Sequence, residues 1–360
     1  MRVVHIMASS EVGGGAKYLE LLLPELRALG VESTVITSPS GPLVDSLRAV
    51  GIAVHTPVNM MAQRWSGRAF WRLRRCVGQC KPDLVHFHGT RAAFQGAFIS
   101  KRYPTIYTSH GSASLPQQSN LRRTLMMLVE RQNALRVRRY TGVSKRDVES
   151  ILGKWKPEAY IPNPVDPRFL AVSPVALDLS QRPKKWRIGT VGRLVPQKGL
   201  ETLLDAASQL GSRIDIDLHI VGGGPLMGAL KKQALELGLN VTFHGSVSDP
   251  LPLLRSFDLF VAPSRWEGQP LSVLEAIAAA IPTVVSDCPG LKELAEELNL
   301  PFTCHTDSAG ALADEILRLI DTPREWLNRE LNRLVVLMTD RTPVKTAERW
   351  LEIYQKELGL

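Results

Sequence analysis

Two cations in the second half of the chain stand where a strand-to-helix turn could bind a phosphate ester. Gly192 and Arg193 follow an apolar run, and Lys198 lies shortly before a helical pattern. An arginine can hold two phosphate oxygens at once, whereas a lysine supplies a mobile point charge. If the apolar run is a parallel strand, both cations lie at its carboxyl end, where α/β sheets bind ligands. Taken singly, two cations on a loop are more often solvated than functional.

A pair of glutamates follows farther along the chain. Glu267 lies in an expected loop, and Glu275 lies in a helix expected to begin near Pro270. Carboxylates near a helix start can bind the hydroxyls of a sugar or a ribose, and the bare amides there would offset the charge of a diphosphate. The segment between the glutamates begins with Gly268, Gln269, Pro270 and Leu271. A glutamate pair with this spacing is otherwise a common surface or capping feature.

Glycine-rich turns follow two of the strand-like runs. One turn contains Gly13, Gly14 and Gly15, and the other contains Gly222 and Gly223. Glycines let backbone amides approach an anion, and a following helix adds positive potential. Neither turn has the spacing of a dinucleotide-binding loop or of a P-loop, which disfavours simple NAD or ATP binding. A tight turn without any ligand explains the glycine triplet equally well.

Histidines and cysteines give little sign of a metal site. His86 and His88 are spaced like two metal ligands, but no cysteine or third ligand stands near them in the sequence, which favours structural histidines. The four cysteines match neither a zinc pattern nor a disulfide framework: Cys76, Cys80, Cys288 and Cys304. The sequence therefore predicts no metal and a reducing compartment.

Several motifs in a fixed order identify a family. The motifs are G-R-L-x-x-x-K-G at 192–199, V-G-x-G-P at 221–225, E-x7-E at 267–275, the glycines at 13–15, Ser109-His110-Gly111, Gly142-Val143-Ser144 and the segment 161–166. In this order and spacing they resemble the retaining family-4 glycosyltransferases of GT-B fold. The resemblance spans nearly the whole chain.

The resemblance implies a role for each candidate residue. His110 would lie beside the transferred sugar, Arg193 and Lys198 would hold the departing diphosphate, and Glu267 would bind sugar hydroxyls. The donor-binding set would be Gly13, Gly14, Gly15, Gly192, Gly222, Gly223, Gly268, Gln269, Pro270, Leu271 and Glu275, the last of these at the ribose. The resemblance implies no metal and no cofactor, because cations and helix-start amides would stabilise the leaving group. The new bond would keep the donor's anomeric configuration.

The chain departs from the family pattern at two points. Where the family often has E-G-F-G-L-P, this chain has Glu267-Gly268-Gln269-Pro270, which keeps the glutamate spacing and bears on sugar selectivity more than on activity. Where the family has P-N-G-V-D, this chain has Pro164 in place of the glycine, which stiffens a linker outside the expected site.

The elements that must position these residues follow from the hydrophobic pattern. Short apolar runs alternate with longer amphipathic ones, as in repeated βαβ units. Strands are expected at 3–7, 33–37, 84–87, 105–109, 140–143, 159–161, 186–191, 217–221, 241–243, 259–262 and 283–286. Helices are expected at 16–29, 43–50, 66–80, 92–101, 121–138, 145–152 and 343–358.

The predicted fold class is α/β of the GT-B type, with two Rossmann-like doubly wound parallel-sheet domains facing across a cleft. Residues 1–168 would form the acceptor domain and 186–342 the nucleotide-sugar donor domain. The proline-rich stretch between them predicts a linker at 169–185. The helix at 343–360 is expected to pack back on the N-terminal domain.

Charge is distributed unevenly between the two halves. Residues 1–170 carry 24 Lys and Arg against 11 Asp and Glu, whereas the chain as a whole has a net charge of +9. We therefore expect the first half to face something anionic, with nucleic acid, anionic lipid and a phosphorylated acceptor as the candidates. No apolar run is long enough to cross a bilayer, and the N-terminus lacks the apolar core of a secretory signal, so we expect a cytoplasmic protein.

Two basic stretches contain 11 of these 24 cations. The first mixes Arg64, Arg68, Arg72, Arg74 and Arg75 with Trp65, Phe70 and Trp71; the second contains Arg122, Arg123, Arg131, Arg136, Arg138 and Arg139. Such a mixture suits a peripheral helix on anionic lipid, here the inner face of the cell membrane. A solvated helix whose aromatics are core fits equally well. No nucleic-acid reader motif accompanies the charges.

Together these observations predict a retaining, metal-independent glycosyltransferase. It would move a hexose or N-acetylhexosamine from a nucleotide-diphosphate sugar, UDP before GDP, to a lipid-linked, lipopolysaccharide or exopolysaccharide acceptor. Two alternatives stay open: a sugar-nucleotide 2-epimerase of the same fold, and a non-catalytic nucleotide-sugar-binding protein at the membrane. The glutamate pair argues against the first, and the complete set of cations and carboxylates argues against the second.

Overall fold

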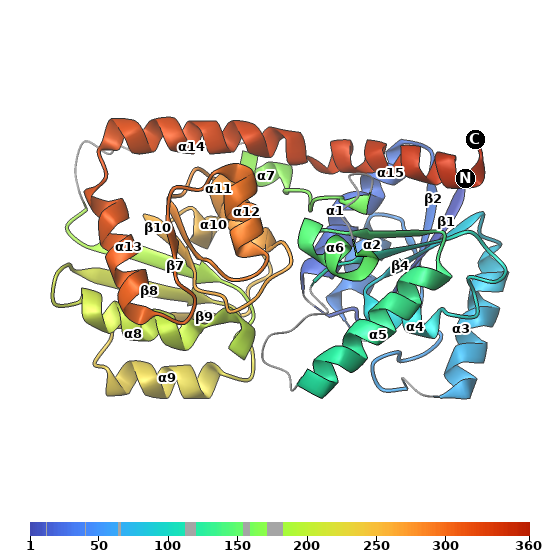
Figure 1. Ribbon diagram of the computed structural model, residues 1–360, viewed down its shortest axis with the longest axis horizontal. Helices are drawn as coiled ribbons and strands as arrows, with labels where there is room; N and C mark the ends of the chain where they lie inside the picture. Colours follow the sequence, from blue (N-terminus) through green and yellow to red (C-terminus); the bar gives the residue numbers. More distant parts are fainter. Residues whose placement is uncertain (12, 40, 64–65, 112–119, 154–158, 171–182) are drawn as a thin grey trace. The chain divides into compact units, whose positions relative to one another are not determined.

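The computed structural model divides the chain into two compact units (Figure 1). The N-terminal unit comprises Met1–Pro164 and Arg341–Leu360, and the C-terminal unit comprises Val165–Asp340. The structure describes residues 1–360 except 12, 40, 64–65, 112–119, 154–158 and 171–182, and the side chains of 120–123. Most of the expected linker at 169–185 therefore lies outside the described residues. The division falls before the boundary expected at residue 168, because Val165 and Phe169 are buried in the core of the C-terminal unit.

The N-terminal unit contains a parallel six-stranded sheet in the order β3-β2-β1-β4-β5-β6. This is the strand order of a Rossmann fold. Its strands are β1 (Arg2–Met7), β2 (Glu32–Ile36), β3 (Ala53–His55), β4 (Leu84–His88), β5 (Thr105–Ser109) and β6 (Arg139–Gly142). The sequence did not indicate β3, and the strand expected at 159–161 is only an isolated bridge between Tyr160 and Gly142.

Helices on both faces cover this sheet. They are α1 (Gly14–Ala28), α2 (Pro42–Ala49), α3 (Gly67–Cys80), α4 (Thr90–Gln95), α5 (Asn120–Arg136), α6 (Lys145–Leu152) and the C-terminal α15 (Pro343–Leu358). The side chain of Ser66 caps α3, and that of Ser144 caps α6. The helix expected at 92–101 extends too far, because α4 ends at Gln95. The next residue is Gly96, a weak helix former, which packs closely against the Phe87 ring.

The C-terminal unit repeats this architecture, with a parallel sheet in the order β12-β11-β10-β7-β8-β9. Its strands are β7 (Trp186–Val191), β8 (Ile216–Val221), β9 (Val241–Gly245), β10 (Leu259–Ala262), β11 (Thr283–Ser286) and β12 (Thr303–Cys304). Its helices are α7 (Pro167–Leu170), α8 (Leu200–Leu210), α9 (Met227–Glu236), α10 (Leu251–Leu254), α11 (Leu271–Ala278), α12 (Leu291–Leu298), α13 (Ala309–Asp321) and α14 (Arg324–Met338), with 3-10 turns η2 (Pro196–Lys198) and η3 (Thr339–Arg341), the last residue of which belongs to the N-terminal unit. Two doubly wound parallel sheets confirm the predicted fold class.

The C-terminal helix α15 completes the core of the N-terminal unit. Its Trp350 and Tyr354 are fully buried in the same apolar cluster as Tyr18 of α1. The indole Nε1 of Trp350 donates a hydrogen bond to the Tyr18 hydroxyl at 2.6 Å. The last residues of the chain are thus part of the first sheet's hydrophobic layer. None of the described helices combines the length and the apolar composition that a membrane span requires.

Candidate active site

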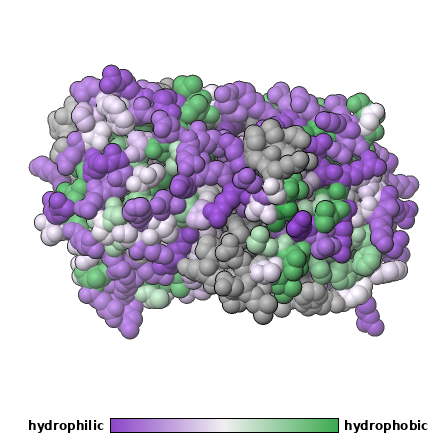
Figure 2. Space-filling model, viewed as in Figure 1, coloured by the Kyte–Doolittle hydropathy of each residue, from purple (hydrophilic) through white to green (hydrophobic). Residues whose placement is uncertain are grey.

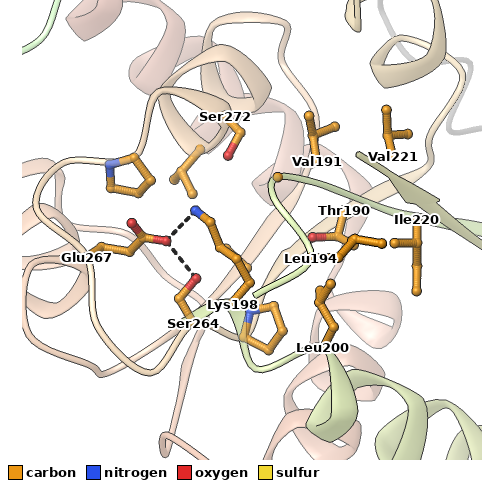
Figure 3. A pocket seen from close by; sticks show the side chains of 15 residues that line it. Thr190, Val191, Leu194, Lys198, Leu200, Ile220, Val221, Ser264, Glu267 and Ser272 are labelled. Carbon is orange, nitrogen blue, oxygen red and sulfur yellow. Dashed lines mark hydrogen bonds and ion pairs between the residues drawn. The ribbon is translucent and has the colours of Figure 1, made fainter. Parts of the chain in front are cut away.

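A pocket in the C-terminal unit lies where three neighbouring strands end (Figure 3). β7, β8 and β10 are adjacent in the sheet, and their last residues, Val191, Val221 and Ala262, line the pocket. Lys198 enters it from η2, and Glu267 enters it from the loop that precedes α11. The carboxyl ends of parallel strands are where doubly wound sheets bind ligands.

Lys198 and Glu267 form an ion pair in this pocket, shown by the dashed line in Figure 3. The Lys198 Nζ lies 2.5 Å from Oε1 of Glu267, whose side chain is only 7% exposed. Ser264 Oγ donates to the same oxygen at 2.8 Å, and Gln197 Nε2 donates to Oε2 at 3.2 Å. A carboxylate at this depth requires such partners, because an unpaired buried charge is costly. The structure thus brings together two of the predicted site residues.

The residues that hold Glu267 in place were not foreseen from the sequence. Gln197 occupies an unspecified position of the 192–199 motif, and Ser264 precedes the glutamate pair, so neither carries a motif signal of its own. Arg265 ties the two loops together: its Nη1 donates to the Pro196 carbonyl at 2.7 Å, and its Nε donates to Asp307 Oδ1 at 2.6 Å. Arg265 therefore fixes the loop after β10 to the start of η2 and to the segment that follows β12.

Arg193, unlike Lys198, forms no ion pair among the residues that the structure describes. Its side chain is exposed, and it has no hydrogen-bond partner among those residues either. It stands five positions before Lys198, in the same loop at the end of β7. A guanidinium in this position can turn toward an incoming anion without first breaking a contact in the protein.

The glycine turns after β7 and β8 pack directly on each other. The Gly192 amide donates to the Val221 carbonyl at 2.9 Å, and the Leu194 amide donates to the Gly223 carbonyl at 2.9 Å. Gly222 has a φ of 137°, and a Cβ there would lie 1.8 Å from the Gly192 carbonyl oxygen. Close backbone approach alone thus requires glycine at 222, and the donor contacts expected of Gly192, Gly222 and Gly223 remain predictions.

Glu275 and the residues before α11 are buried with little room around them. Glu275 is 6% exposed and Gln269 is 7% exposed. Pro270 stands at the N-cap position and offers no side-chain cap, and the first turn of α11 contains no acidic residue. The start of α11 therefore carries no negative charge of its own, in the arrangement that suits an external anion.

Gly290 packs against the backbone of the loop that carries Glu267. Nothing in the sequence indicated this contact. It has a φ of 88°, and a Cβ there would lie 2.2 Å from the Glu267 carbonyl oxygen and 2.5 Å from that of Gly268. The amide of Glu267 also donates to the Pro289 carbonyl at 3.0 Å. The turn at 289–290 thus fixes the backbone from which the Glu267 side chain projects.

We expect the substitution Gly290→Ala to displace this loop and to lower the affinity for any ligand of the pocket at least tenfold. The left-handed backbone and the backbone contacts both oppose a Cβ, at a cost of about 1–3 kcal/mol. Gly228→Ala is the matched control, because a Cβ at this helical glycine meets nothing within 4 Å. Ligand affinity and Tm of both variants, compared with the parent protein, test the prediction; an unchanged affinity in Gly290→Ala would contradict it.

In the N-terminal unit, the structure places His110 beside the glycine triplet. His110 follows the last residue of β5, and its Cδ2 lies 3.9 Å from a Cβ built on Gly15 in the first turn of α1. A Cβ on Gly13 or Gly14 would meet nothing within 4 Å, so packing does not require glycine there. The roles expected of the triplet and of His110 remain predictions.

Four histidines form one cluster in this unit, of which His5, His86 and His88 are buried and His110 is partly exposed. His5 faces His86 across the β1–β4 pairing, and these two imidazoles offer ligand atoms, together with His88, all within 4.8 Å of one another. The sequence offered no third ligand for His86 and His88, but strand pairing supplies His5. Each ring nitrogen of the three nevertheless has a hydrogen-bond partner, including Tyr354 and Thr108 on His86 at 2.7 Å each. A metal would have to displace several of these bonds, so a structural role fits the cluster better.

Comparisons with known proteins support the sequence resemblance. The family described as Glycosyltransferase Family 4 matches residues 12–169, and the family described as Glycosyl transferases group 1 matches residues 185–322. The O-antigen biosynthesis glycosyltransferase WbnH of Escherichia coli is 31% identical to this chain over 241 residues. The match covers 65% of this chain and 66% of WbnH, so this chain spans just under two thirds of the length of that relative. The phosphatidyl-myo-inositol mannosyltransferase of Mycobacterium leprae is 27% identical over 331 residues, covering 87% of this chain and 85% of that protein.

Solved structures show the same architecture. The crystal structure of Anabaena HepE in complex with UDP and glucose has a TM-score of 0.82 against this chain. The match covers 99% of this chain and 100% of HepE at 20% sequence identity. At that identity the likeness shows the fold alone.

Proposed function

The chain belongs to the family-4 and group 1 glycosyltransferases, and from this premise we propose that it is a retaining transferase that needs no metal ion. It moves a hexose or N-acetylhexosamine from a nucleotide-diphosphate sugar to a lipid-linked, lipopolysaccharide or exopolysaccharide acceptor. UDP is the first candidate nucleotide and GDP the second. The relatives support this choice, because their names include O-antigen biosynthesis and a UDP-galactose donor, and HepE was crystallised with UDP and glucose.

The ion pair of Lys198 with Glu267 is the observation that carries the proposal. An incoming diphosphate competes with the carboxylate for the Lys198 ammonium. Glu267 keeps its hydrogen bonds from Ser264 and Gln197 when the ammonium turns away, so the side chain stays in place and its oxygens can accept hydrogen bonds from sugar hydroxyls. Before the donor binds, each partner therefore holds the other in place.

The charge that develops on the departing diphosphate is stabilised by this chain's own groups. Lys198 and Arg193 supply positive charge, and the N-terminus of α11, whose first turn contains no acidic residue, supplies the positive end of a helix. Such preorganised groups can replace a divalent ion on a leaving phosphate. A phosphate oxygen then assists the removal of the acceptor's hydroxyl proton, while the acceptor attacks the face that the diphosphate leaves, which retains the anomeric configuration. Glu275 is assigned to the ribose and His110 to the transferred sugar.

Sugar transfer from a labelled donor tests this proposal. We expect UDP-sugars, or failing these GDP-sugars, to label a bacterial lipid extract, with equal rates in EDTA and in Mg²⁺. NMR of the product should show the anomer of the donor. Conversion of the donor to its 2-epimer without any acceptor would favour the epimerase, and binding without any product would favour a non-catalytic protein. Either outcome would overturn the proposed activity.

We further propose that the N-terminal unit docks on an anionic membrane, where such acceptors reside. Residues 60–140 contain 15 Lys and Arg but only Asp83 and Glu130 as acids, and Glu130 is fully buried. An aromatic groove lies among α3, the end of α4 and α5; its lining includes Phe70, Phe94, Phe98, Lys101 and Arg136. Of the basic stretches, Arg64, Trp65 and the side chains of Arg122 and Arg123 lie outside the described residues.

Apolar side chains stand exposed around this groove. Trp71 is 60% exposed and Phe98 is 61% exposed, so these aromatics are not core residues. Figure 2 shows apolar residues gathered over α5, where Leu125, Leu128 and Leu135 are exposed. Exposed apolar residues among cations suit insertion below lipid head groups, with the cations at the phosphates.

We expect the protein to float with vesicles that contain about one third anionic lipid and to stay unbound with neutral vesicles. The variant Phe98→Ser, Lys101→Glu, Arg136→Glu should bind the anionic vesicles at least tenfold more weakly, since each cation near the surface contributes roughly 1 kcal/mol. The control variant Leu235→Ser, Lys232→Glu changes an 80% exposed leucine and an exposed lysine of α9 in the C-terminal unit. Equal binding of both variants, or equal binding to both kinds of vesicle, would contradict the proposal.

A further inference from the structure

A chain of imidazole hydrogen bonds leads from His110 into the core of the N-terminal unit. His110 Nε2 lies 3.0 Å from His88 Nδ1, and His88 Nε2 lies 3.1 Å from His5 Nδ1. The chain ends at Ser33, whose Oγ lies 3.4 Å from His5 Nε2. His5 and His88 are buried, whereas His110 is partly exposed and its Nδ1 has no hydrogen-bond partner among the residues described.

Aromatic and hydroxyl groups around this imidazole chain hold the rings in place. The Tyr18 ring meets the His110 ring edge to face at 4.8 Å between centroids, and Trp350 of α15 anchors the Tyr18 hydroxyl. His86 packs on His88 and is itself held by Tyr354 and Thr108. Burial lowers the pKa of His110 to about 4 and that of His5 to about 3, and it also lowers the pKa of His88. Burial therefore favours the neutral form of all three imidazoles.

Neutrality couples the three rings. A neutral imidazole has one N–H and one bare nitrogen, so each ring that accepts a hydrogen bond at one nitrogen must donate from the other. The chain therefore has two possible directions. In one, His5 donates to His88 and His88 donates to His110, which leaves the proton of His110 on Nδ1. In the other, every proton sits on Nε2, and Nδ1 of His110 is bare.

The buried end of the chain selects between these directions. If His5 carried its proton on Nε2, that buried N–H would face only the Ser33 hydroxyl at 3.4 Å, beyond a good hydrogen bond. If the proton is on Nδ1, it is donated to His88 at 3.1 Å, and the bare Nε2 is an acceptor that the Ser33 hydroxyl can reach. Buried N–H groups without a good acceptor are rarer than underused acceptors.

We propose that His5 and His88 are positioning residues that hold His110 as the tautomer with its proton on Nδ1, directed away from the core. His110 then acts as a neutral hydrogen-bond donor to an oxygen of the substrate and not as a base. The inference rests on the proposed transferase function for the identity of that oxygen, but the tautomer is a property of the protein alone.

The tautomer can be measured in ¹⁵N-histidine-labelled protein by long-range ¹H–¹⁵N correlation NMR between pH 5.5 and 8. The His110 signals are identified as those that disappear in the His110→Gln variant. We expect Nδ1 protonated and Nε2 bare in His110, His88 and His5 throughout this range. A proton on Nε2 of His110, or a positively charged His110 at pH 6, would overturn the inference. Correct tautomers in a protein that transfers no sugar would overturn the proposed function and leave the inference standing.

Two variants of His5, which does not touch His110, test the coupling. Asparagine can keep a donor in place of Nδ1–H, whereas leucine removes it. We expect His5→Leu to give a mixture of His110 tautomers and to lower kcat about fivefold with little change in the KM of the donor sugar. His5→Asn should keep the tautomer and most of kcat. An unchanged His110 tautomer in folded His5→Leu would show that the chain does not set it.

Discussion

Replacing Lys198 by methionine is expected to lower kcat for sugar transfer by about 10²–10³-fold, the cost of removing one preorganised group that stabilises charge in a transition state. Lys198 is the cation that already reaches the pocket, and its partner Glu267 positions it before any ligand arrives. The measurement is steady-state kinetics with the donor identified by the transfer assay. Lys232→Met is the matched control, because this lysine is 78% exposed on α9 and should leave kcat unchanged. A loss below tenfold in Lys198→Met would contradict the role.

The same substitution has a stability effect that separates structure from chemistry. Without Lys198, the Glu267 carboxylate keeps the hydrogen bonds from Ser264 and Gln197 but loses its cation. We expect the free energy of unfolding to fall by about 2–3 kcal/mol, less than for a fully enclosed pair because Lys198 is 19% exposed. Adding Glu267→Gln should restore most of the lost stability, because no buried charge remains. It should not restore transfer. Recovery of both stability and kcat in the double variant would mean that the lysine serves only the fold.

Trp350→Ala is expected to destabilise the N-terminal unit by about 3–5 kcal/mol, the range for removing a large buried aromatic side chain. Trp350 is fully buried against Tyr18. The substitution also removes the hydrogen bond that the indole N–H donates to the Tyr18 hydroxyl. Hydrogen exchange followed by mass spectrometry should show faster exchange in β1, β4 and α1 while β7 and β8 stay protected. Val344→Ala, at a 44% exposed position of the same helix, is the control. Faster exchange confined to the C-terminal unit would show that α15 does not support the first sheet.

The local parts of the site could be predicted from the sequence. The strand at 186–191 was given its observed bounds, and the cations after it follow the strand end as expected. These features depend only on hydrophobic runs and on residues next to them in the chain. The shortest strands, β3 with three residues and β12 with two, are too brief to give a periodic pattern. They form because neighbouring strands pair with them.

The residues that the sequence did not reveal act through contacts distant in the chain. Gly290 fixes the backbone of Glu267 from a different loop, and no local pattern connects the two. His5 was within reach of prediction: in a Rossmann strand order the first and fourth strands are adjacent, and residues of one face alternate along each strand. That reasoning places His5 beside His86, as the β1–β4 register shows. The donor contact predicted for Gly222 stays a prediction, because packing against Gly192 already accounts for a glycine at this position.

Calorimetric titration of UDP and GDP, in EDTA, into the parent protein and into Lys198→Met tests the central claim most directly. The claim is that the Lys198–Glu267 pocket of the C-terminal unit binds a nucleoside diphosphate without a metal ion. The account predicts that one of the two nucleotides binds the parent protein and that Lys198→Met binds it at least tenfold more weakly, whereas Lys232→Met binds it normally. Binding that requires Mg²⁺, or binding that Lys198→Met leaves unchanged, would contradict the account.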